Sequence, residues 1–307
     1  MDRVESSRAA GAAPTGRAPE MDARILDRMR CPVCGEPLAE ASAGTARALR
    51  CPRRHSFDVA RQGYVNLLAG RAPHVGDTAE MVAARADFLA AGHYDLISAA
   101  LAATAAAVTA PTTGAYPLVV DAGAGTGRHL AAVLSALPEA VGLALDVSKP
   151  ALRRAARAHP RAAAALADTW QRLPLADGAA TLLLNVFAPR NGPEFHRVLD
   201  PAGALLVVTP AEDHLAELVG PLGLLRVDPA KEDRVAGSLG QHFTRTDDTV
   251  HRRALTLTGP EVATLVGMGP SAWHTDPSGL AARIAGLAEP VRVTAAVRLA
   301  VWRPLPR

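Results

Sequence analysis

Four apolar runs from residue 119 onward predict the strands of a parallel sheet. They cover residues 119–121, 141–146, 181–187 and 204–209, and each leads into a polar or turn residue. Runs that are apolar at nearly every position are typical of parallel strands covered by helices on both faces. A later segment, residues 291–302, alternates apolar and polar positions and is predicted to be the closing strand.

Two helices are predicted around these strands. Residues 129–136 follow a glycine-rich turn, and the sequence Asp77-Thr-Ala-Glu80 has the pattern of a capping box that opens a second helix. Met81, Ala84 and Phe88 follow it at helical spacing. Helices that alternate with apolar strands predict an α/β fold. A chain of 307 residues that is 49% hydrophobic can form one large α/β domain with a small accessory domain.

The first predicted strand leads into the glycine-rich turn Asp121-Ala-Gly-Ala-Gly-Thr-Gly127. Gly123, Gly125 and Gly127 permit the backbone angles of a tight turn and let a ligand approach without interference from a Cβ atom. The second strand ends at Asp146, nineteen residues after the last of these glycines. An acid there accepts hydrogen bonds from the ribose hydroxyls of a nucleotide-like cofactor, in NAD enzymes and in methyltransferases alike.

The acid that precedes the glycines favours methyl transfer over hydride transfer. Asp121 followed by this turn resembles motif I of class I S-adenosylmethionine methyltransferases. Asp168 matches the acid that contacts adenine in that superfamily, and a solvated acid or a helix cap is the alternative. The resemblance implies a Rossmann-like domain and a set of residues that bind S-adenosylmethionine: Asp121, Gly123, Gly125, Thr126, Gly127, Asp146, Asp168 and Asn185.

The strand predicted at residues 181–187 carries Asn185 and Phe187 at its carboxyl end, followed by Arg190. In open α/β sheets the reacting groups gather at that edge, so we expect these side chains beside the methyl donor. Phe187 is suited to stack on a base and Asn185 to pair with its edge, which makes both candidate catalytic residues. A core position for Phe187 and a turn-capping role for Asn185 are equally consistent with the sequence.

All three cysteines lie near the N-terminus with the spacing C-x2-C-x16-C-x3-H, formed by Cys31, Cys34, Cys51 and His55. Two such knuckles brought together by a hairpin complete a tetrahedral zinc site, and three Cys with one His are a usual structural set. A closed set leaves no position for substrate water, so we expect a structural metal. A fourth ligand other than His55 stays open.

Arginine dominates the basic residues, because only Lys149 and Lys231 among the 33 basic residues are lysines. Residues 22–71 hold nine arginines against five acids. An arginine-rich face binds phosphate bidentately, although a solvated face is an equal alternative. Five of these arginines lie around the second knuckle: Arg47, Arg50, Arg53, Arg54 and Arg61.

No apolar run reaches the roughly 20 residues of a membrane span. Residues 1–20 lack the apolar core of a signal peptide, and we interpret them as a disordered extension. Three cysteines without an export signal indicate a reduced protein of the cytoplasm. The start of translation, at Met1 or at Met21, stays open.

Several unusual short motifs together resemble the bacterial 23S rRNA (guanine-N1)-methyltransferases over nearly the whole chain from Met21. Besides the cysteine and glycine motifs, they are Gly63-Tyr-Val-Asn-Leu67, Gly76-Asp-Thr-Ala-Glu-Met81, Gly92-His-Tyr94, Phe187-Ala-Pro189 and Met268-Gly-Pro-Ser271. The resemblance implies that S-adenosylmethionine and zinc are cofactors and that a 23S rRNA hairpin is the partner. The target implied is N1 of a guanine in the hairpin 35 loop, and which of the two adjacent guanines is modified stays open. A macrolide-resistance role of the tylosin type and a housekeeping role both stay open.

With this resemblance the chain divides into four segments. Residues 1–20 are the extension, residues 21–72 a zinc-binding RNA-recognition domain, residues 73–110 a helical linker, and residues 111–307 the methyltransferase domain. The oligomeric state, including a homodimer, stays open. The sequence at Glu212-Asp213 departs from the family's pattern, which puts RNA contacts by that loop in doubt.

Two other classes of function remain as alternatives. A small-molecule methyltransferase would share the glycine-rich turn but has little use for zinc knuckles. A non-catalytic zinc-ribbon protein that binds nucleic acid would keep the arginines but not the cofactor acids. No residue identifies itself from the sequence as the base that removes the guanine N1 proton.

Overall fold

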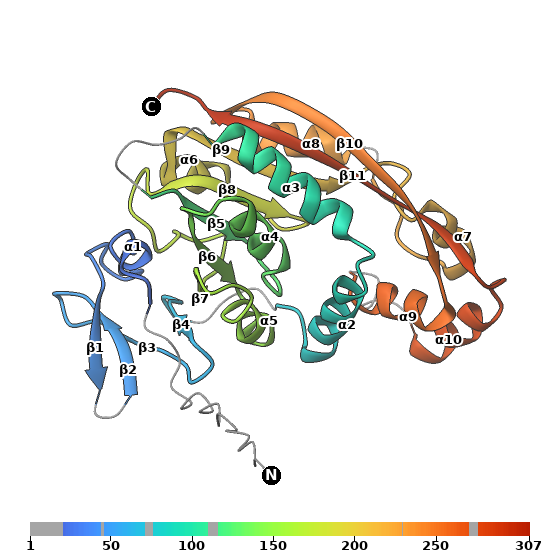
Figure 1. Ribbon diagram of the computed structural model, residues 1–307, viewed down its shortest axis with the longest axis horizontal. Helices are drawn as coiled ribbons and strands as arrows, with labels where there is room; N and C mark the ends of the chain where they lie inside the picture. Colours follow the sequence, from blue (N-terminus) through green and yellow to red (C-terminus); the bar gives the residue numbers. More distant parts are fainter. Residues whose placement is uncertain (1–20, 44–45, 71–75, 110–115, 229, 270–275) are drawn as a thin grey trace, which may run out of the picture.

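The computed structural model describes residues 21–43, 46–70, 76–109, 116–228, 230–269 and 276–307. The predicted extension over residues 1–20 and the predicted boundaries at 72/73 and 110/111 lie outside the described residues. The chain forms one eight-stranded mixed sheet with helices on both faces, and a small three-stranded sheet stands at one end (Figure 1).

The large sheet is mostly parallel, with two antiparallel strands at one edge. Its parallel part contains, in order, β7 (Ala162–Leu166), β6 (Val141–Asp146), β5 (Leu118–Ala122), β8 (Ala180–Val186) and β9 (Leu199–Pro210). Two antiparallel strands follow, β11 (Val291–Pro304) and β10 (Phe243–Leu257). The order reverses between β5 and β8, which is the place where α/β sheets bind ligands. The predicted α/β fold is confirmed.

Two separate apolar cores cover the two faces of this sheet. The helices α3 (Asp95–Val108), α4 (Arg128–Ala136) and α5 (Lys149–Ala155) contribute to one core. The helices α1 (Ala23–Leu26), α6 (Gly192–Val198) and α8 (Lys231–Leu239) contribute to the other. Because parallel strands are buried on both sides, β6 sends Ala144 into the first core and Leu143 and Leu145 into the second.

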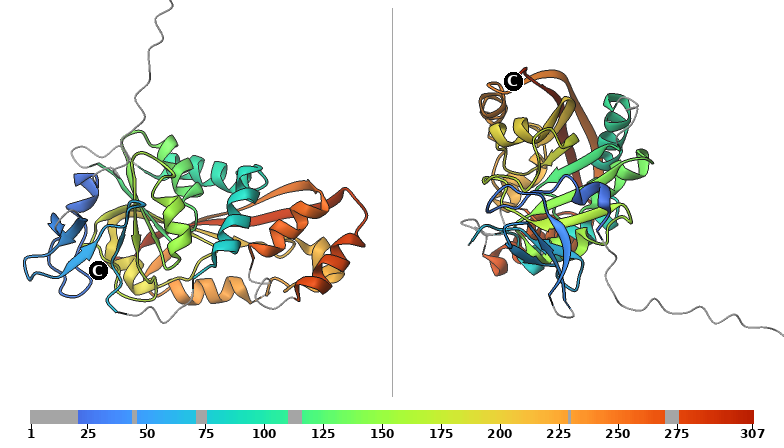
Figure 2. Two further views of the ribbon diagram at one scale, coloured as in Figure 1. Left: turned by 90° about the horizontal axis from the view of Figure 1, so that it is seen from below. Right: turned by 90° about the vertical axis from the view of Figure 1, so that its left-hand side faces the viewer.

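A group of helices gathers beyond the parallel strands, along the part of the β10–β11 hairpin that extends past the sheet (Figures 1 and 2). They are α2 (Ala79–Ala90), α7 (Ala216–Leu222), α9 (Gly259–Gly267) and α10 (Pro277–Ala285). The capping box predicted at the start of α2 is wrong in register. Thr78 is the N-cap, and its hydroxyl accepts a hydrogen bond from Met81 N at 3.3 Å, because that amide is the one within reach of the cap.

The N-terminal module consists of α1 and an antiparallel sheet of β1 (Ala39–Ala43), β2 (Ala46–Arg50) and β3 (Ser56–Asp58). The next strand, β4 (Tyr64–Asn66), leaves the module and pairs in parallel with β7 at the edge of the large sheet. Ile25 and Met29 are fully buried in the same core as the second face of the large sheet. The module is therefore joined to the methyltransferase fold by a shared core and by β4.

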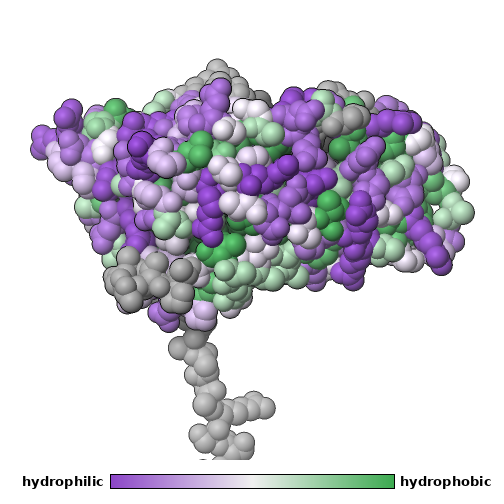
Figure 3. Space-filling view, turned by 90° about the horizontal axis from the view of Figure 1, so that it is seen from above, coloured by the Kyte–Doolittle hydropathy of each residue, from purple (hydrophilic) through white to green (hydrophobic). Residues whose placement is uncertain are grey.

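The edge strand β10 carries charged residues that discourage pairing with another chain. Arg245 pairs with Glu232 at 2.9 Å and with Asp248 at 2.8 Å, and Arg252 pairs with Asp213 at 2.8 Å. Figure 3 views the molecule from above and shows hydrophilic residues spread between small apolar patches. Among the described residues, no helix has the length and apolar character needed to cross a membrane.

Candidate functional site

The structure brings the four predicted zinc ligands together. One ligand atom from each of Cys31, Cys34, Cys51 and His55 lies within 4.8 Å of the others. The His55 Nδ1 atom is 3.6 Å from Cys31 Sγ and 3.3 Å from Cys51 Sγ, and Cys34 Sγ is 3.6 Å from Cys51 Sγ. Ligand atoms of a tetrahedral zinc lie roughly 3.5–3.8 Å apart, so this donor set fits zinc in both chemistry and spacing.

Two tight turns present these ligands. In the first knuckle Gly35 N donates to Cys31 O at 2.8 Å, and Gly35 adopts a positive φ of 77°. In the second knuckle Arg54 N donates to Cys51 O at 2.9 Å, and Arg54 adopts a φ of 68°. A non-glycine residue with positive φ is uncommon, and here it lies in the turn between two ligands.

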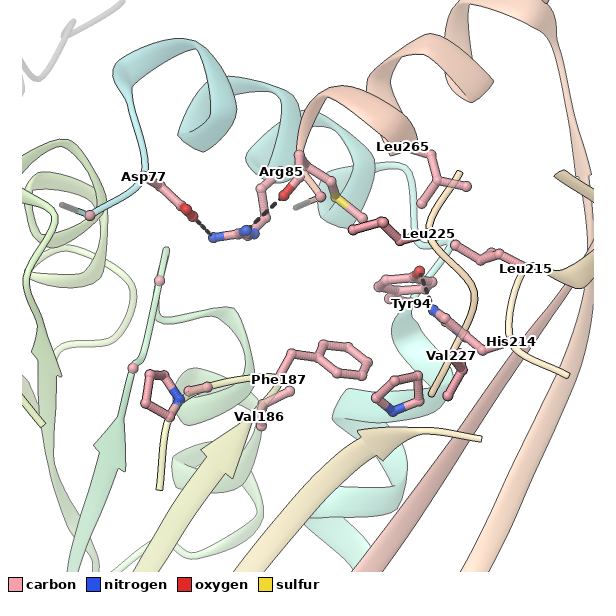
Figure 4. Close-up of a pocket in the computed structure, with 18 of the residues that line it drawn as sticks. Asp77, Arg85, Tyr94, Val186, Phe187, His214, Leu215, Leu225, Val227 and Leu265 are labelled. Carbon is pink, nitrogen blue, oxygen red and sulfur yellow. Dashed lines mark hydrogen bonds and ion pairs between the residues drawn. The ribbon is translucent and has the colours of Figure 1, made fainter. Parts of the chain in front are cut away.

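A cavity of about 760 Å³ lies at the carboxyl ends of the parallel strands, below α2 and α9 (Figure 4). Five of the predicted site residues line it, namely Gly123, Gly125, Asp146, Asp168 and Phe187. The other predicted site residues do not line the cavity: Asp121, Thr126, Gly127 and Asn185.

The glycine-rich turn after β5 needs glycine for two separate reasons. Gly123, Gly125 and Gly127 have φ values of 85°, 54° and 77°, a region that side chains rarely adopt. A Cβ atom at Gly123 would also lie 2.4 Å from the Cβ of Ala188, which belongs to the loop after β8. The two loops can therefore meet at the cavity only when position 123 is glycine.

Asp146 at the end of β6 is held by backbone amides. Its Oδ2 accepts from Gly125 N and its Oδ1 from Ser148 N, both at 2.8 Å. Burial raises the pKa of this carboxyl, and the two amide donors oppose that rise. Each oxygen keeps a further lone pair, so the group can still accept hydrogen bonds from ligand hydroxyls in the cavity.

Two buried polar side chains lie behind the cavity floor. Burial, together with the nearby Asp146, raises the pKa of Asp121 to about 8, and its Oδ1 has no hydrogen-bond partner among the described residues. Asn185 is fully buried, and its Nδ2 donates to Ala122 O at 3.2 Å and to Pro189 O at 2.8 Å. Its amide therefore holds the loop after β8 against the end of β5.

Asp168 is also braced by its own loop. Asp168 is 4% exposed, and its Oδ1 accepts from Trp170 N at 2.9 Å. Trp170 lines the cavity and is 52% exposed, although it belongs to no motif that the sequence analysis identified. An indole and a carboxylate beside one opening suit a planar, hydrogen-bonding ligand.

An ion pair bridges the roof of the cavity. Arg85 on α2 contacts the carboxylate of Asp77 and donates through its second terminal nitrogen to Met268 O at 2.8 Å (Figure 4). This arrangement joins α2 to the end of α9 above the glycine-rich turn. No local pattern could identify Arg85 as this link, because its partner Met268 is 183 residues away in the chain.

The opposite end of the cavity has an aromatic wall formed by Tyr94, Phe187 and His214. The ring centroid of Phe187 lies 6.4 Å from that of Tyr94 and 6.0 Å from that of His214. Phe187 is 44% exposed and has a φ of 52°, so the loop directs its ring into the open part of the cavity (Figure 4). Sequence reasoning missed His214, which belongs to no motif.

The comparisons with known proteins agree with this geometry. The zinc-ribbon family described as RlmA, N-terminal, matches residues 29–72. A protein of Micromonospora griseorubida named as a putative 23S rRNA (guanine-N1)-methyltransferase is 70% identical, over 92% of this chain and 99% of its own. The 23S rRNA (guanine(748)-N1)-methyltransferase of Streptomyces fradiae is 53% identical, over 93% of this chain and 100% of its own.

The zinc-ribbon match covers the Cys3His cluster, and the two relatives cover the cofactor edge as well. The chain is thus an enzyme with a class I methyltransferase fold, with S-adenosylmethionine and zinc as its cofactors. The small-molecule and non-catalytic alternatives are not favoured, because neither relative is named for such a role. At 70% and 53% identity over nearly full length, the chain belongs to the 23S rRNA (guanine-N1)-methyltransferase family.

Proposed function

We propose that this enzyme methylates N1 of a guanine in the hairpin 35 loop of 23S rRNA, at the position that corresponds to guanine 748. The observation that carries the proposal is the 53% identity, over the full length of the relative, to the Streptomyces fradiae enzyme named for that guanine. The cavity supports it, because an aromatic wall beside a nucleotide-type cofactor edge suits a base that has been flipped out of a loop.

S-adenosylmethionine supplies the methyl group as a sulfonium when it is bound. We assign its ribose hydroxyls to Asp146 and its adenine to Asp168, since both acids line the cavity. Gly123 and Gly125 leave room for it, while Thr126 and Gly127 complete the turn. Asp121 places an unsatisfied carboxyl oxygen behind this turn, where a cationic ligand would offset the unfavourable burial of its negative charge.

The two candidate catalytic residues receive different roles. Phe187 presents an exposed ring to the cavity, so we assign it to stacking on the target base. Asn185 was expected to pair with the base edge, but its amide is fully buried and bonded to two carbonyls. We therefore assign it as a positioning residue that fixes the loop carrying Phe187.

We assign zinc to Cys31, Cys34, Cys51 and His55, and phosphate contacts to the arginine face beside them. The arginine face comprises Arg50, Arg53, Arg54 and Arg61, which are exposed. The nearby Arg47 is less available, since it pairs with Glu40 at 2.7 Å. Shape and phosphate contacts are the usual basis of RNA hairpin recognition, and a rigid arginine-bearing module provides them.

Primer extension on hairpin 35 after incubation with purified enzyme tests the proposal. A methyl group on N1 removes a Watson–Crick donor, so we expect a new stop next to guanine 748 that requires S-adenosylmethionine. A methylated product without that stop would contradict the assignment.

Replacing Arg50, Arg53 and Arg54 together by Gln should lower the log–log salt slope of RNA binding by roughly one unit per lost phosphate contact. Replacing Arg252 and Arg253 is the matched control.

We infer that the enzyme works in the cytoplasm, because its substrate is ribosomal RNA. Expression in a strain whose own hairpin 35 guanine is unmodified should raise tolerance to a tylosin-type macrolide, and unchanged tolerance would favour a housekeeping role. Light scattering of the purified protein decides between a monomer and a homodimer.

A further inference from the structure

The hydrogen-bond partners of His214 determine which of its nitrogens carries the proton. Ala296 N is 3.2 Å from His214 Nδ1, and a backbone amide can only donate. Nδ1 is therefore an acceptor, and in the neutral ring the proton resides on Nε2.

This tautomer determines the direction of the bond to Tyr94. His214 Nε2 lies 3.2 Å from the Tyr94 hydroxyl oxygen. Since Nε2 carries the proton, it donates and the tyrosine oxygen accepts. Figure 4 shows this contact between the two side chains. The hydroxyl hydrogen of Tyr94 is then available to an acceptor other than His214.

Tyr94 is placed to present that hydrogen to a ligand. It lines the cavity with Phe187 and His214, yet it is only 5% exposed, so its hydroxyl is largely shielded from bulk water. Burial raises the pKa of Tyr94 above its ordinary value, so the hydroxyl stays protonated and can donate at neutral pH. The charged groups around this wall include His93 with Glu261, whose Nε2 and Oε1 are 3.0 Å apart, and Asp213 beside His214, which pairs with Arg252 at 2.8 Å.

Guanine N1 chemistry calls for a donor of this kind. When N1 loses its proton to water, the negative charge is shared between N1 and the exocyclic O6. The N1 lone pair then forms the bond to the methyl carbon, while the carbon–sulfur bond breaks and its electron pair stays on sulfur. A fixed donor at O6 stabilises the anion in a water-poor site, as oxyanion-type donors do.

We propose that Tyr94 is a catalytic residue that donates a hydrogen bond to O6 of the target guanine, and that His214 is the positioning residue that orients its hydroxyl. The inference rests on the proposed function and adds to it the group that stabilises charge on the base. The aromatic wall then offers the base both the Tyr94 hydroxyl and the exposed ring of Phe187, whose centroid lies 6.4 Å from that of Tyr94.

The variant Tyr94→Phe removes the hydroxyl and keeps the ring. We expect single-turnover methylation of the hairpin to slow by roughly 100-fold, in the range found for loss of one oxyanion donor. Affinity for S-adenosylmethionine and for the hairpin should change less than twofold. The rising limb of the pH–rate profile should move to higher pH, because N1 ionises less readily without the donor. Tyr64→Phe, at a buried tyrosine of β4 outside the cavity lining, is the matched control.

His214 should act only through Tyr94. We expect His214→Ala to slow the reaction less than Tyr94→Phe, and the double variant to be no slower than Tyr94→Phe alone. Multiplied rate losses in the double variant would contradict an orienting role. Melting temperatures of all variants separate loss of function from loss of fold.

A hairpin with 6-thioguanosine at the target position tests the contact itself. Sulfur accepts hydrogen bonds weakly, so the rate difference between wild type and Tyr94→Phe should narrow several-fold on this substrate. An unchanged difference, or equal rates of both enzymes on ordinary guanosine, would overturn the inference. Absence of any N1 methylation by wild type would instead defeat the proposed function, so the two failures are distinguishable.

Discussion

The zinc cluster draws its four ligand atoms from residues 31–55, whereas the cavity draws its groups from strands and loops far apart in the chain. Two tight turns and one short hairpin suffice for the cluster. The cavity requires β5, β6 and β8 in parallel register, with α2 and α9 above them. Its Asp146 and Gly125 meet only because β5 pairs with β6.

The two regions therefore depend on different sources of stability. The zinc module is a small antiparallel sheet with little core of its own. In such modules the free energy of metal binding supplies the free energy of folding. The cavity edge relies on strands that are buried on both faces. Val119, Val120 and Leu143 in these strands are fully buried. Loss of metal and loss of loop geometry should consequently affect different parts of the molecule.

The largest expected effect is loss of the metal from Cys51→Ser. Structural zinc contributes roughly 10–16 kcal/mol in zinc-finger peptides, more than any single contact in the hairpin. We expect near-complete loss of zinc by mass spectrometry and rapid hydrogen exchange in β1–β3. Since α1 and β4 are anchored in the large sheet, β5 to β9 should keep their protection.

The matched control for this variant is Val33→Ala, which changes an exposed residue of the same knuckle. It should keep both zinc and protection. Equal loss of protection in β5 and in β2 would show that the two regions share one stability, and full zinc content in Cys51→Ser would remove Cys51 from the ligand set.

A smaller effect is expected from Gly123→Ala at the cavity. Alanine in the left-handed region costs about 1–2 kcal/mol, and the contact with Ala188 adds to this cost or displaces the loop. We expect at least a tenfold loss of S-adenosylmethionine affinity by calorimetry, with zinc content unchanged. Gly178→Ala is the control, since Gly178 has a φ of 65° but no atom within 4 Å of an added Cβ. Equal affinities of the two variants would mean that Gly123 is not part of the cofactor cradle.

The last effect concerns the pH dependence of folding stability. Burial raises the pKa of Asp121 from its ordinary value of 3.8 to about 8. Between these values the unfolded chain releases this proton while the folded chain keeps it. Folding stability from this group therefore falls as pH rises, by at most about 1.4 kcal/mol per unit. Asp121→Asn should remove that slope between pH 5 and 8 in urea unfolding, and Asp58→Asn should leave it. A slope that persists in Asp121→Asn would assign it to another group.

Local signals allowed much of this molecule to be predicted. The apolar runs located β5, β6 and β8 to within one residue at each end and the second half of β9, because a doubly covered strand excludes polar side chains. The alternating pattern of residues 291–302 located β11. The Cys and His spacing predicted a cluster that the structure confirms as a close set of donors, since its geometry depends on two short turns. The three glycines of the turn after β5 were also identifiable from the sequence, because a left-handed backbone favours glycine.

Other features depended on contacts that no local pattern encodes. β7 is almost entirely alanine, a helix-favouring residue, and it is a strand because β4 and β6 pair with it on both sides. The charged strand β10 gave no apolar signal, since it is an edge strand paired only with β11.

The site shows the same division between sequence and tertiary structure. The order of residues along the chain was enough to predict which residue types stand at the carboxyl ends of β5, β6 and β8. The burial of Asn185 behind the cavity and the place of Phe187 in its lining depend on the folded loop, which bends at a positive φ. It alone brought His214 to Tyr94, 120 residues apart in the chain. Side chains on separate elements meet only after the sheet has fixed its order and register.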